Sequence, residues 1–407
     1  MNIKLTAPLS IRGDMNLPYS KSISNRVLLL NKLAESKISP ENVAVCDDSE
    51  MMQRALSAKE SVIDTGAAGT ATRFATAYLS MLAGEHILTG SERMKQRPIA
   101  VLVDALRKIG ADIEYVEREG FLPLKIRGRL LKGGVIELNG GVSSQYVSAL
   151  LMIAPYMENG LKLILTGDII SFPYIKMTLA LMARYGVSAT VKDNVITVPS
   201  GRYNPIPYRI EADWSAASYW YGFVALSNDA DIILEGLDND SIQGDSKVAS
   251  LFSPLGVATE YNDCYIALRK CNAVRKLYEA DLTDTPDLAQ TIVVTAALKD
   301  IPFKLTGLQS LRIKETDRIA ALVEEMKKLG YVLDASEEGA LSWNGEKVLP
   351  EENISIATYD DHRMAMSFSL ASFIFPRLEI CNATVVTKSY PSFWTDLSKA
   401  GFIVEEC

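Results

Sequence analysis

One pattern of apolar and polar positions recurs along the chain. A segment with helical spacing of apolar residues ends at a glycine, and short segments of alternating polarity follow it, as at residues 99–109, 113–116 and 124–126. A glycine directly after a helix can take the left-handed backbone conformation that ends helices. This pattern predicts α/β units of a strand, a helix and further strands. The units repeat at intervals of about 70 residues, with a degraded copy at residues 51–63 and the glycines at Gly110, Gly186, Gly256, Gly330 and Gly401.

Units of this size cannot bury both faces of a sheet alone, so they are expected to pack together. A chain of 407 residues is long enough for two or more domains. A turn-rich stretch at residues 200–207 separates two of the units and suggests a boundary. We therefore expect two like lobes, residues 14–208 and residues 1–13 together with 209–407, facing each other with the functional site between them.

Basic residues stand at the predicted starts of several helices, where the helix dipole disfavours a cation by about 0.3–1 kcal/mol. Serines place one start near residues 20–22, and Pro98 places another at residue 99. Thr316 is the expected cap of a helix over residues 319–329, and further helices are expected over 364–375 and 393–399. Five such starts in an acidic chain predict a site for one or two ligands with several negative charges. The basic residues concerned are Lys21, Arg26, Arg97, Lys314, Arg318, Arg363 and Lys388.

The composition narrows the class of ligand. The chain has 42 basic and 50 acidic residues and a net charge of −8, which disfavours general nucleic-acid binding but allows a small anionic substrate in a local basic cleft. The first residues lack the apolar core of a signal peptide, and no apolar run reaches ~18 residues. We therefore expect a cytoplasmic protein that binds neither nucleic acid nor membrane. The scattered cysteines predict reduced thiols, with neither disulfides nor a zinc site; they are Cys46, Cys264, Cys271, Cys381 and Cys407.

Three polar segments have two interpretations each. The glycine-rich residues 64–74 either let backbone amides approach an anion or form a tight turn before a core helix. Residues 143–145 and 171–174 either cap the helices that follow them or offer hydroxyl and amide donors to a ligand.

Two carboxylates and one of the two histidines also have two interpretations. Asp287 and Glu315 lie at helix starts, where the dipole favours them, but they also lie among the basic residues, where they could act as acid or base. His86 falls in a predicted strand and is expected to be structural. His362, beside Arg363, has either a supporting or a structural role.

Several motifs occur in a fixed order along nearly the whole chain. The most specific are Lys-Glu-Thr-Asp-Arg at residues 314–318 and Asp-His-Arg-Met-Ala-Met at residues 361–366. The others are Ser-Lys-Ser-Ile-Ser-Asn-Arg at 20–26, Gly-Thr at 69–70, Leu-Thr-Gly at 88–90, Arg-Met-Lys-Gln-Arg-Pro-Ile at 93–99 and Ser-Ser-Gln at 143–145. With these motifs the sequence closely resembles the EPSP synthase (3-phosphoshikimate 1-carboxyvinyltransferase) family of enolpyruvyl transferases.

The resemblance implies an "inside-out" α/β barrel fold of two domains, each with three βαβ-type repeat units, and an active site in the cleft between them. It implies transfer of the enolpyruvyl group from phosphoenolpyruvate to the 5-hydroxyl of shikimate 3-phosphate, with release of phosphate. This is a step of the shikimate pathway to chorismate and the aromatic amino acids. No metal or other cofactor is implied, and a monomer is expected.

The resemblance also implies roles for individual residues. Asp287 would be the base for the 5-hydroxyl, and Glu315 with Lys21 would move the proton at the methylene carbon. Shikimate 3-phosphate would be held by Lys21, Ser22, Arg26, Ser143, Ser144, Gln145, Ser171, Tyr174, Asp287 and Lys314. Phosphoenolpyruvate would be held by Lys21, Gly69, Arg97, Gln145, Arg318, Arg363 and Lys388, where arginines offer a planar fork of donors to phosphate and carboxylate.

The sequence departs from the family pattern in three places, which concern substrate affinity more than the type of reaction. Ala67 replaces an asparagine of the glycine-rich turn, Ser310 replaces an asparagine before Lys314, and Phe172 replaces a lysine or similar polar residue. Because Gly69 is retained, we expect glyphosate to compete with phosphoenolpyruvate, at a potency that the loss of the amide leaves open.

Two alternatives remain. A UDP-N-acetylglucosamine enolpyruvyltransferase would share the architecture and the donor, but that family usually carries a reactive cysteine in the loop at residues 91–96, and this chain has none there. A non-catalytic binder of phosphorylated metabolites would be expected to lose Asp287 or Glu315, and both are present.

Overall fold

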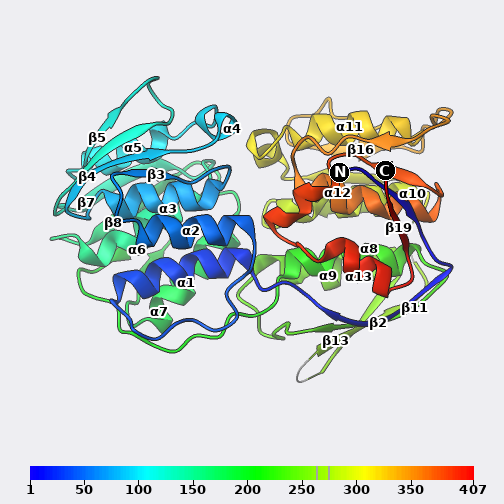
Figure 1. Cartoon of the computed structure of the whole chain (residues 1–407), viewed down its shortest axis with the longest axis horizontal. Helices are drawn as coiled ribbons and strands as arrows, with labels where there is room; N and C mark the ends of the chain where they lie inside the picture. The colour runs from blue at the N-terminus through cyan, green and yellow to red at the C-terminus, as the bar shows by residue number, and fades with distance from the viewer. Residues whose placement is uncertain (263–264, 274–275) are drawn as a thin grey trace. The chain divides into compact units, whose positions relative to one another are not determined.

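The computed structural model describes residues 1–262, 265–273 and 276–407, so Cys264 lies outside the described residues. The chain forms two compact units, Ser20–Ile210 and Met1–Tyr19 with Glu211–Cys407. We call them the inserted unit and the terminal unit. The boundary expected after residue 13 cuts strand β2 (Ser10–Asn16), which pairs along its whole length with β11 (Asp229–Glu235) of the terminal unit (Figure 1).

The sheets of the described residues share one plan: two parallel strands, then antiparallel neighbours. In the inserted unit the order is β3 (Val62–Asp64), β4 (Gly84–Thr89), β6 (Leu124–Gly128), β5 (Asp112–Tyr115), and then β7 (Gly134–Asn139), β8 (Leu161–Thr166), β10 (Val195–Val198), β9 (Thr190–Lys192). The third repeat of the inserted unit contains helices α1 (Lys21–Leu33) and α2 (Asp47–Ser57). An isolated β-bridge joins Glu41, between these two helices, to Arg209.

The terminal unit repeats the plan. Its sheets are β2, β11, β13 (Tyr265–Lys270), β12 (Val257–Tyr261); then β14 (Tyr278–Asp281), β15 (Phe303–Thr306), β16 (Leu341–Trp343); then β17 (Ser355–Ile356), β18 (Leu378–Ile380), β1 (Ile3–Thr6), β19 (Ile403–Glu406). Strand β1 comes from the opposite end of the chain from its neighbours β18 and β19. The whole inserted unit lies in sequence between β2 and the helix that leads to its partner β11.

The helix-ending glycines confirm the repeat predicted from the sequence. Each has a left-handed backbone, with φ between 91° and 104°. In each case a strand, or a strand pair, follows, and the predicted hairpins β5–β6, β9–β10 and β12–β13 are all antiparallel. The local signal was reliable because only glycine takes this conformation without strain.

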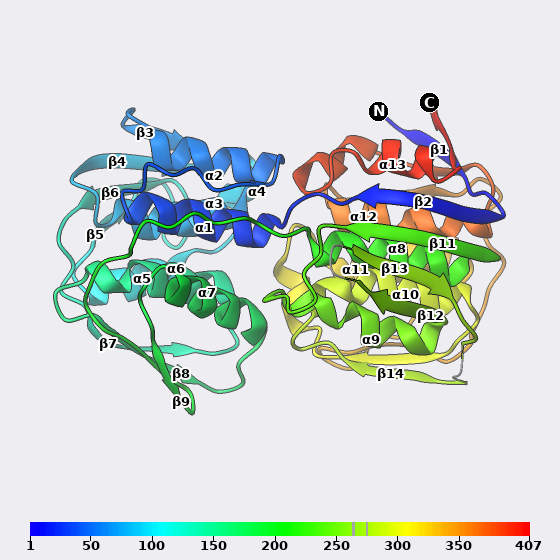
Figure 2. The same cartoon turned by 90° about the horizontal axis from the view of Figure 1, so that it is seen from below.

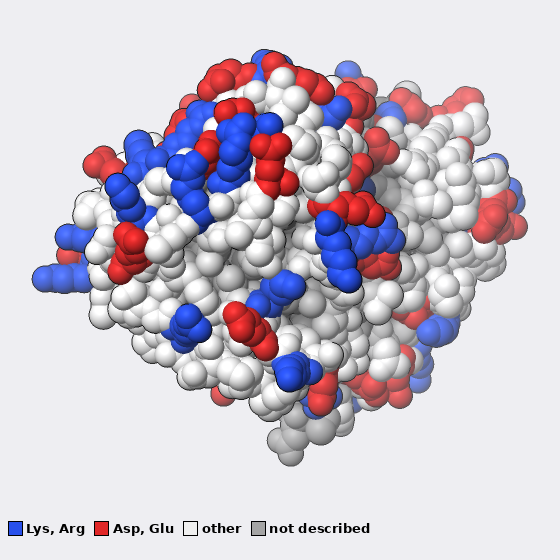
Figure 3. Space-filling view, turned by 60° about the vertical axis from the view of Figure 1, so that its left-hand side comes forward, with Lys and Arg blue, Asp and Glu red and all other residues white. Residues whose placement is uncertain are grey.

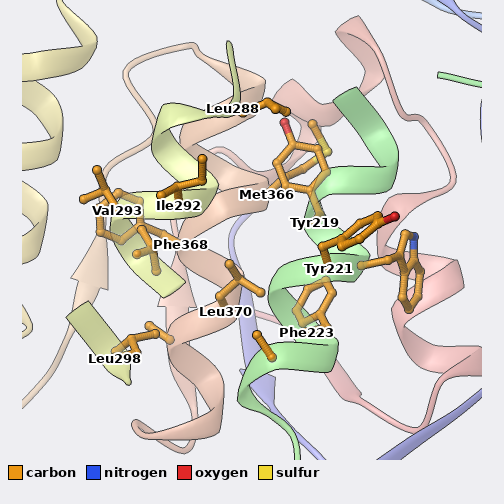
Figure 4. Packing of buried hydrophobic residues seen from close by; sticks show 14 of the residues in the cluster. Tyr219, Tyr221, Phe223, Leu288, Ile292, Val293, Leu298, Met366, Phe368 and Leu370 are labelled. Carbon is orange, nitrogen blue, oxygen red and sulfur yellow. The ribbon is translucent and has the colours of Figure 1, made fainter. Parts of the chain in front are cut away.

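The helices lie inside and the sheets outside. In the terminal unit, α8 (Trp214–Leu226), α10 (Ala289–Leu298) and α12 (His362–Phe368) are almost entirely buried and pack against one another (Figure 4). A Cβ on Gly222 of α8 would lie 2.7 Å from Leu370, in the 3-10 helix η6 (Ser369–Phe373), and 3.1 Å from Thr295 of α10, so these helices are in close contact there. In Figure 2 the sheet of β2, β11, β13 and β12 lies in front of these helices.

The remaining helices complete the units. In the inserted unit they are α3 (Gly69–Leu79), α4 (Glu92–Lys95), α5 (Ala100–Lys108), α6 (Ser144–Ile153) and α7 (Phe172–Arg184). In the terminal unit they are α9 (Val248–Phe252), α11 (Arg318–Lys328) and α13 (Phe393–Lys399).

The outer faces of the sheets carry paired charges. Arg127 of β6 donates to Glu114 of β5 at 2.8 Å and to Glu85 of β4 at 3.1 Å. Such exposed pairs contribute little stability but keep the surface polar. On the face drawn in Figure 3, acidic and basic side chains are interleaved in the same manner.

Candidate active-site groups in the two units

In the inserted unit, Arg26 joins three helices near their first turns. Its Nε donates to Thr178 Oγ1 of α7 at 2.7 Å, and its Nη2 donates to Ser148 Oγ of α6 at 3.2 Å. Its Nη1 donates to the Ser22 carbonyl of α1 at 2.8 Å, and Nη2 also reaches the Tyr174 carbonyl at 3.4 Å. Arg26 therefore fixes the starts of α1, α6 and α7 beside one another.

Arg26 is a buried cation, 2% exposed, that forms no ion pair with a carboxylate among the described residues. Its partners are neutral oxygens and the ring of Phe74 in α3, which lies 5.5 Å from the guanidinium carbon. Burial lowers the pKa of the guanidinium to about 10, so it remains charged at neutral pH. Because an uncompensated buried charge is costly, this arrangement favours binding of an anion.

Gly69, Arg73 and Arg97 meet at the start of α3. A Cβ on Gly69 would lie 2.7 Å from both the Arg73 and the Arg97 guanidinium nitrogens. Arg73 donates to the Gly69 carbonyl at 3.0 Å. At the start of α6, the Gln145 amide donates to Thr70 Oγ1 of α3 at 3.0 Å. Two guanidinium groups, an amide and a hydroxyl therefore come together here, from α3, from α6 and from the segment before α5.

The other expected residues of the inserted unit lie at the same helix starts. Ser20 caps α1, and Lys21, its first residue, lies 3.3 Å from Asp48 of α2. Ser143 caps α6. Ser171 precedes α7 with a left-handed φ of 55° and forms no capping bond, and such a strained non-glycine residue is typical of functional sites.

In the terminal unit, Asp287 is the centre of a charge cluster. It belongs to the 3-10 helix η4 (Pro286–Leu288) directly before α10. Its Oδ1 accepts from Arg318 Nη1 at 2.8 Å and lies 3.6 Å from Lys314 Nζ, and its Oδ2 accepts from Arg363 Nη2 at 3.1 Å. The prediction that Asp287 lies among these cations is confirmed.

Arg318 is the most buried of these cations, at 1% exposed. It donates to Asp361 at 2.7 and 3.3 Å and to Glu315 at 2.9 Å. Burial lowers the pKa of Arg318, but the carboxylates of Asp361, Glu315 and Asp287 outweigh burial and raise it overall. Its guanidinium is therefore permanently charged and held in a fixed orientation.

Two expectations about helix ends were wrong in detail. The cap of α11 is Asp317, whose Oδ1 accepts from the Ile319 and Ala320 amides at 3.1 Å, not Thr316. The helix predicted over residues 364–375 begins at His362 and continues after residue 368 only as η6. The helix expected over residues 393–399 is confirmed, and Lys388 precedes it as expected, at the end of the 3-10 helix η7 (Ala383–Lys388). The Lys388 ammonium donates to the Asp360 carbonyl just ahead of α12, at 2.5 Å.

The histidines differ in setting. His86 lies in β4, as predicted, and both its ring nitrogens are buried without a hydrogen-bond partner among the described residues. His362 is 2% exposed, and its Nδ1 lies 3.8 Å from Asp361 Oδ1.

Four residues that contact the proposed site residues, directly or through another of the four, were not predicted from the sequence. They are Asp361, Arg73, Asp245 and Ser215. Asp361 is fully buried and both caps α12 and binds Arg318. Acidic residues at helix starts look like caps, and only the contact with Arg318 distinguishes this one. The signal for Arg73 was present, because it lies four residues after Gly69 and hence on the same side of α3.

Asp245 is a buried acid that touches the cluster through Ser215. The Ser215 hydroxyl donates to Asp245 and lies 3.5 Å from Arg363 Nη2. Burial, together with the nearby Asp287, raises the pKa of Asp245 to about 7, although Arg363 and the Ser215 bond act in the opposite direction. Asp213, the cap of α8, adds to the increase.

This pKa predicts a pH effect on stability. Between the ordinary aspartate pKa of about 3.9 and about 7, the folded state keeps a proton on Asp245 that the unfolded chain loses, so stability falls as pH rises. Asp245→Asn replaces the titrating carboxyl group by an amide that stays neutral throughout this pH range. We expect the free energy of unfolding, measured by urea titration at pH 5 and pH 8, to fall less in Asp245→Asn than in the wild type. Equal falls in the two proteins would show that Asp245 does not titrate in this range.

Known proteins resemble this chain over nearly its whole length. The profile of the family described as EPSP synthase (3-phosphoshikimate 1-carboxyvinyltransferase) matches residues 53–397. A relative from Bacteroides fragilis, named 3-phosphoshikimate 1-carboxyvinyltransferase, is 54% identical over 403 residues, covering 99% of this chain and 98% of the relative. The chain belongs to the EPSP synthase family. A second relative of that name, from Cellvibrio japonicus, is 37% identical over 428 residues, covering 98% of this chain and 99% of the relative.

The EPSP synthase fold is also shared with solved structures. An EPSP synthase from Acinetobacter baumannii matches over 100% of both chains with a TM-score of 0.78 at 21% identity. The enolpyruvyl transferase fold predicted from the sequence is confirmed, and membership of this family makes the chain an enzyme of the shikimate pathway. None of the helices in the described ranges is long and apolar enough to cross a membrane.

Proposed function

We propose that the groups at the helix starts of the two units act on one pair of substrates, shikimate 3-phosphate and phosphoenolpyruvate. The reaction is the family's enolpyruvyl transfer to the 5-hydroxyl, with release of phosphate. The proposal rests on the cations that gather at helix starts in both units. The inserted unit has a buried cation, Arg26, that forms no ion pair with a carboxylate among the described residues, and the terminal unit has a carboxylate, Asp287, held by several cations.

In this proposal the inserted unit holds the shikimate phosphate. Arg26 supplies the buried positive charge, and the surrounding hydroxyl groups and helix N-termini supply further donors. The residues proposed to bind shikimate 3-phosphate are Lys21, Ser22, Arg26, Ser143, Ser144, Gln145, Ser171 and Tyr174, with Asp287 and Lys314 of the terminal unit.

Phosphoenolpyruvate carries a phosphate and a carboxylate, which suit the planar donors of arginine. Arg318 is pre-oriented by Asp361, so it can bind an anion without losing much side-chain entropy. The proposed phosphoenolpyruvate ligands are Lys21, Gly69, Arg97, Gln145, Arg318, Arg363 and Lys388.

Asp287 is proposed as the base. In the free enzyme its cations favour the carboxylate form, which makes it a weak base. When substrate anions bind, Arg318 and Arg363 share their charge with them, and the basicity of Asp287 rises. Substrate binding would thus activate the group that accepts the proton of the 5-hydroxyl.

The remaining proton transfers are proposed for Glu315 and Lys21. The Lys21 ammonium delivers a proton to the methylene carbon of phosphoenolpyruvate, and the adjacent carbon, now electrophilic, forms a bond to the 5-oxygen, whose proton passes to Asp287. The resulting tetrahedral intermediate loses phosphate as its C–O bond breaks, and a proton of the methyl group passes to the Glu315 carboxylate to form the enolpyruvyl product. Glu315 is kept near the cluster by its contact with Arg318 at 2.9 Å.

Release of phosphate from phosphoenolpyruvate tests the proposal. We expect release that depends on shikimate 3-phosphate and not on UDP-N-acetylglucosamine. Release with the UDP-sugar alone would support the alternative transferase, and no release with either acceptor, despite binding of phosphoenolpyruvate, would support a non-catalytic binder.

Gly69→Ala tests the proposed phosphoenolpyruvate site. The added methyl group would lie 2.7 Å from the Arg73 and Arg97 guanidinium nitrogens, so both side chains must move. We expect the KM for phosphoenolpyruvate to rise by about tenfold, the effect of losing one charged hydrogen bond of about 1.5 kcal/mol, with little change in the KM for shikimate 3-phosphate. Gly134→Ala is the control, because a Cβ there has nothing within 4 Å, although its φ of 109° adds a local strain. An unchanged KM for phosphoenolpyruvate in Gly69→Ala would contradict the assignment.

We further propose that glyphosate competes with phosphoenolpyruvate, and that the enzyme is a cytoplasmic monomer. Inhibition curves at several phosphoenolpyruvate concentrations test the competition, and inhibition independent of that concentration would contradict it. Light scattering of the purified chain tests the monomer.

A further inference from the structure

Helix α11 holds the loop before α12 at two points on one face. Arg318 and Glu325 are seven residues apart, so their side chains lie on the same side of the helix. Arg318 binds Asp361 at 2.7 Å. Glu325 Oε1 accepts from the Tyr359 hydroxyl at 2.6 Å, and its Oε2 accepts from the Ala357 amide at 3.1 Å. The loop at residues 357–361 is therefore fixed at both ends by one helix.

The Glu325 side chain is fully buried, and both of its carboxylate oxygens accept hydrogen bonds. Lys328, one turn further along α11, donates to its two oxygens at 2.8 and 3.0 Å and also to the Ser355 carbonyl at 3.2 Å. A buried carboxylate is costly unless it is paired and hydrogen-bonded. Among the described residues, the cation paired with Glu325 is Lys328, which is not proposed to hold substrate, so the proposed chemistry gives no reason for a carboxylate here.

The loop that Glu325 holds is strained. Tyr359 and Asp360 are consecutive non-glycine residues in the left-handed region, with φ of 55° and 53°. Such residues persist only where the surrounding contacts over-determine them. The strained turn, closed by a bond from the Asp361 amide to the Thr358 carbonyl at 2.8 Å, aims the Asp360 carbonyl at Lys388 and the Asp361 carboxylate at Arg318.

We infer that Glu325 and Tyr359 are positioning residues for phosphoenolpyruvate. They hold residues 357–361 in the strained conformation that orients Lys388 and Arg318. The inference rests on the proposed function, because these two cations are the proposed phosphoenolpyruvate ligands. If the network served stability alone, weakening it would lower the free energy of unfolding without affecting one substrate more than the other.

Tyr359→Phe removes one hydroxyl and tests the inference. We expect the KM for phosphoenolpyruvate to rise about tenfold, with the KM for shikimate 3-phosphate changed less than twofold. The matched control is Tyr221→Phe, which removes a hydroxyl that is paired with Thr259 at 3.0 Å elsewhere in the same unit. The control should lose similar stability and leave both KM values unchanged. Glu325→Gln, which keeps the shape but removes the charge, should act in the same direction as Tyr359→Phe.

A double-mutant comparison separates positioning from stability. Asp360→Gly relieves the left-handed strain at residue 360, since glycine takes this conformation freely, and it keeps the carbonyl that Lys388 binds while removing the carboxylate that accepts from Asn382 at 2.7 Å. Tyr359→Phe should therefore raise the KM for phosphoenolpyruvate by a smaller factor in the Asp360→Gly variant than in the wild type. Equal effects on both substrates, a loss confined to kcat, or a ratio that Asp360→Gly leaves unchanged would each overturn the inference. A wild-type enzyme inactive with both substrates would instead overturn the proposed function.

Discussion

Replacing Asp287 by alanine is expected to lower kcat at least a hundredfold, as removal of a general base does, while the chain remains folded. Asp287 is the proposed acceptor of the 5-hydroxyl proton and contacts Arg318, Arg363 and Lys314. Its removal also frees these cations from a competing carboxylate, so binding of phosphoenolpyruvate should be retained or tightened. Steady-state phosphate release gives kcat, and equilibrium titration gives the affinity.

Asp284→Ala is the matched control for this prediction. Asp284 lies three residues earlier, is 43% exposed and pairs with the exposed Lys247 at 2.8 Å. Its removal should leave kcat within about twofold of the wild type, since exposed ion pairs contribute little. Turnover of Asp287→Ala close to that of the wild type would remove Asp287 from the mechanism.

Replacing Arg318 by methionine is expected to lower the free energy of unfolding by about 3–5 kcal/mol, because it leaves the buried carboxylate of Asp361 without the guanidinium that pairs with it. Asp361, with 0% of its side chain exposed, loses both of its bonds to Arg318, and Asp287 and Glu315 lose one each. Urea-induced unfolding measures the change.

Arg269→Met is the control for an arginine with two carboxylate partners at the surface. Arg269 is 49% exposed and pairs with Asp231 and Glu260 at 3.3 Å. Its replacement should cost at most about 1 kcal/mol. If Arg318→Met were no less stable than Arg269→Met, the cluster around Asp287 would not be a buried network. Arg318→Lys should fall between the two, because it keeps the charge but not the planar fork of donors.

The local features of the fold could be predicted from the sequence. The C-terminal glycines, the hairpins after them and the start of α1 depend on a few neighbouring residues. The caps were less certain, because Thr316 and Asp317 can both cap a helix. The difference was decided by the backbone, since Asp317 is the last residue with an extended conformation before α11.

The pairing of distant segments could not be read from the sequence. Strand β1 joins β18 and β19 near the other end of the chain, and β2 joins β11 across the inserted unit. Strand pairing depends on which edges remain free after the units have packed, and no local pattern encodes it. For the same reason, the boundary expected after residue 13 fell inside β2.

The candidate site divides in the same way. The sequence determined which side chains could hold anions and placed them at helix starts, because dipoles, caps and charges are local properties. Only the tertiary structure decided that Asp287 touches Arg318 and Arg363, that Asp361 and Asp245 lie behind them, and that Glu325 holds the strained residues before α12. The physical reason is that the energy of a charge depends on its distance from other charges and on its burial, and folding sets both without regard to separation along the chain.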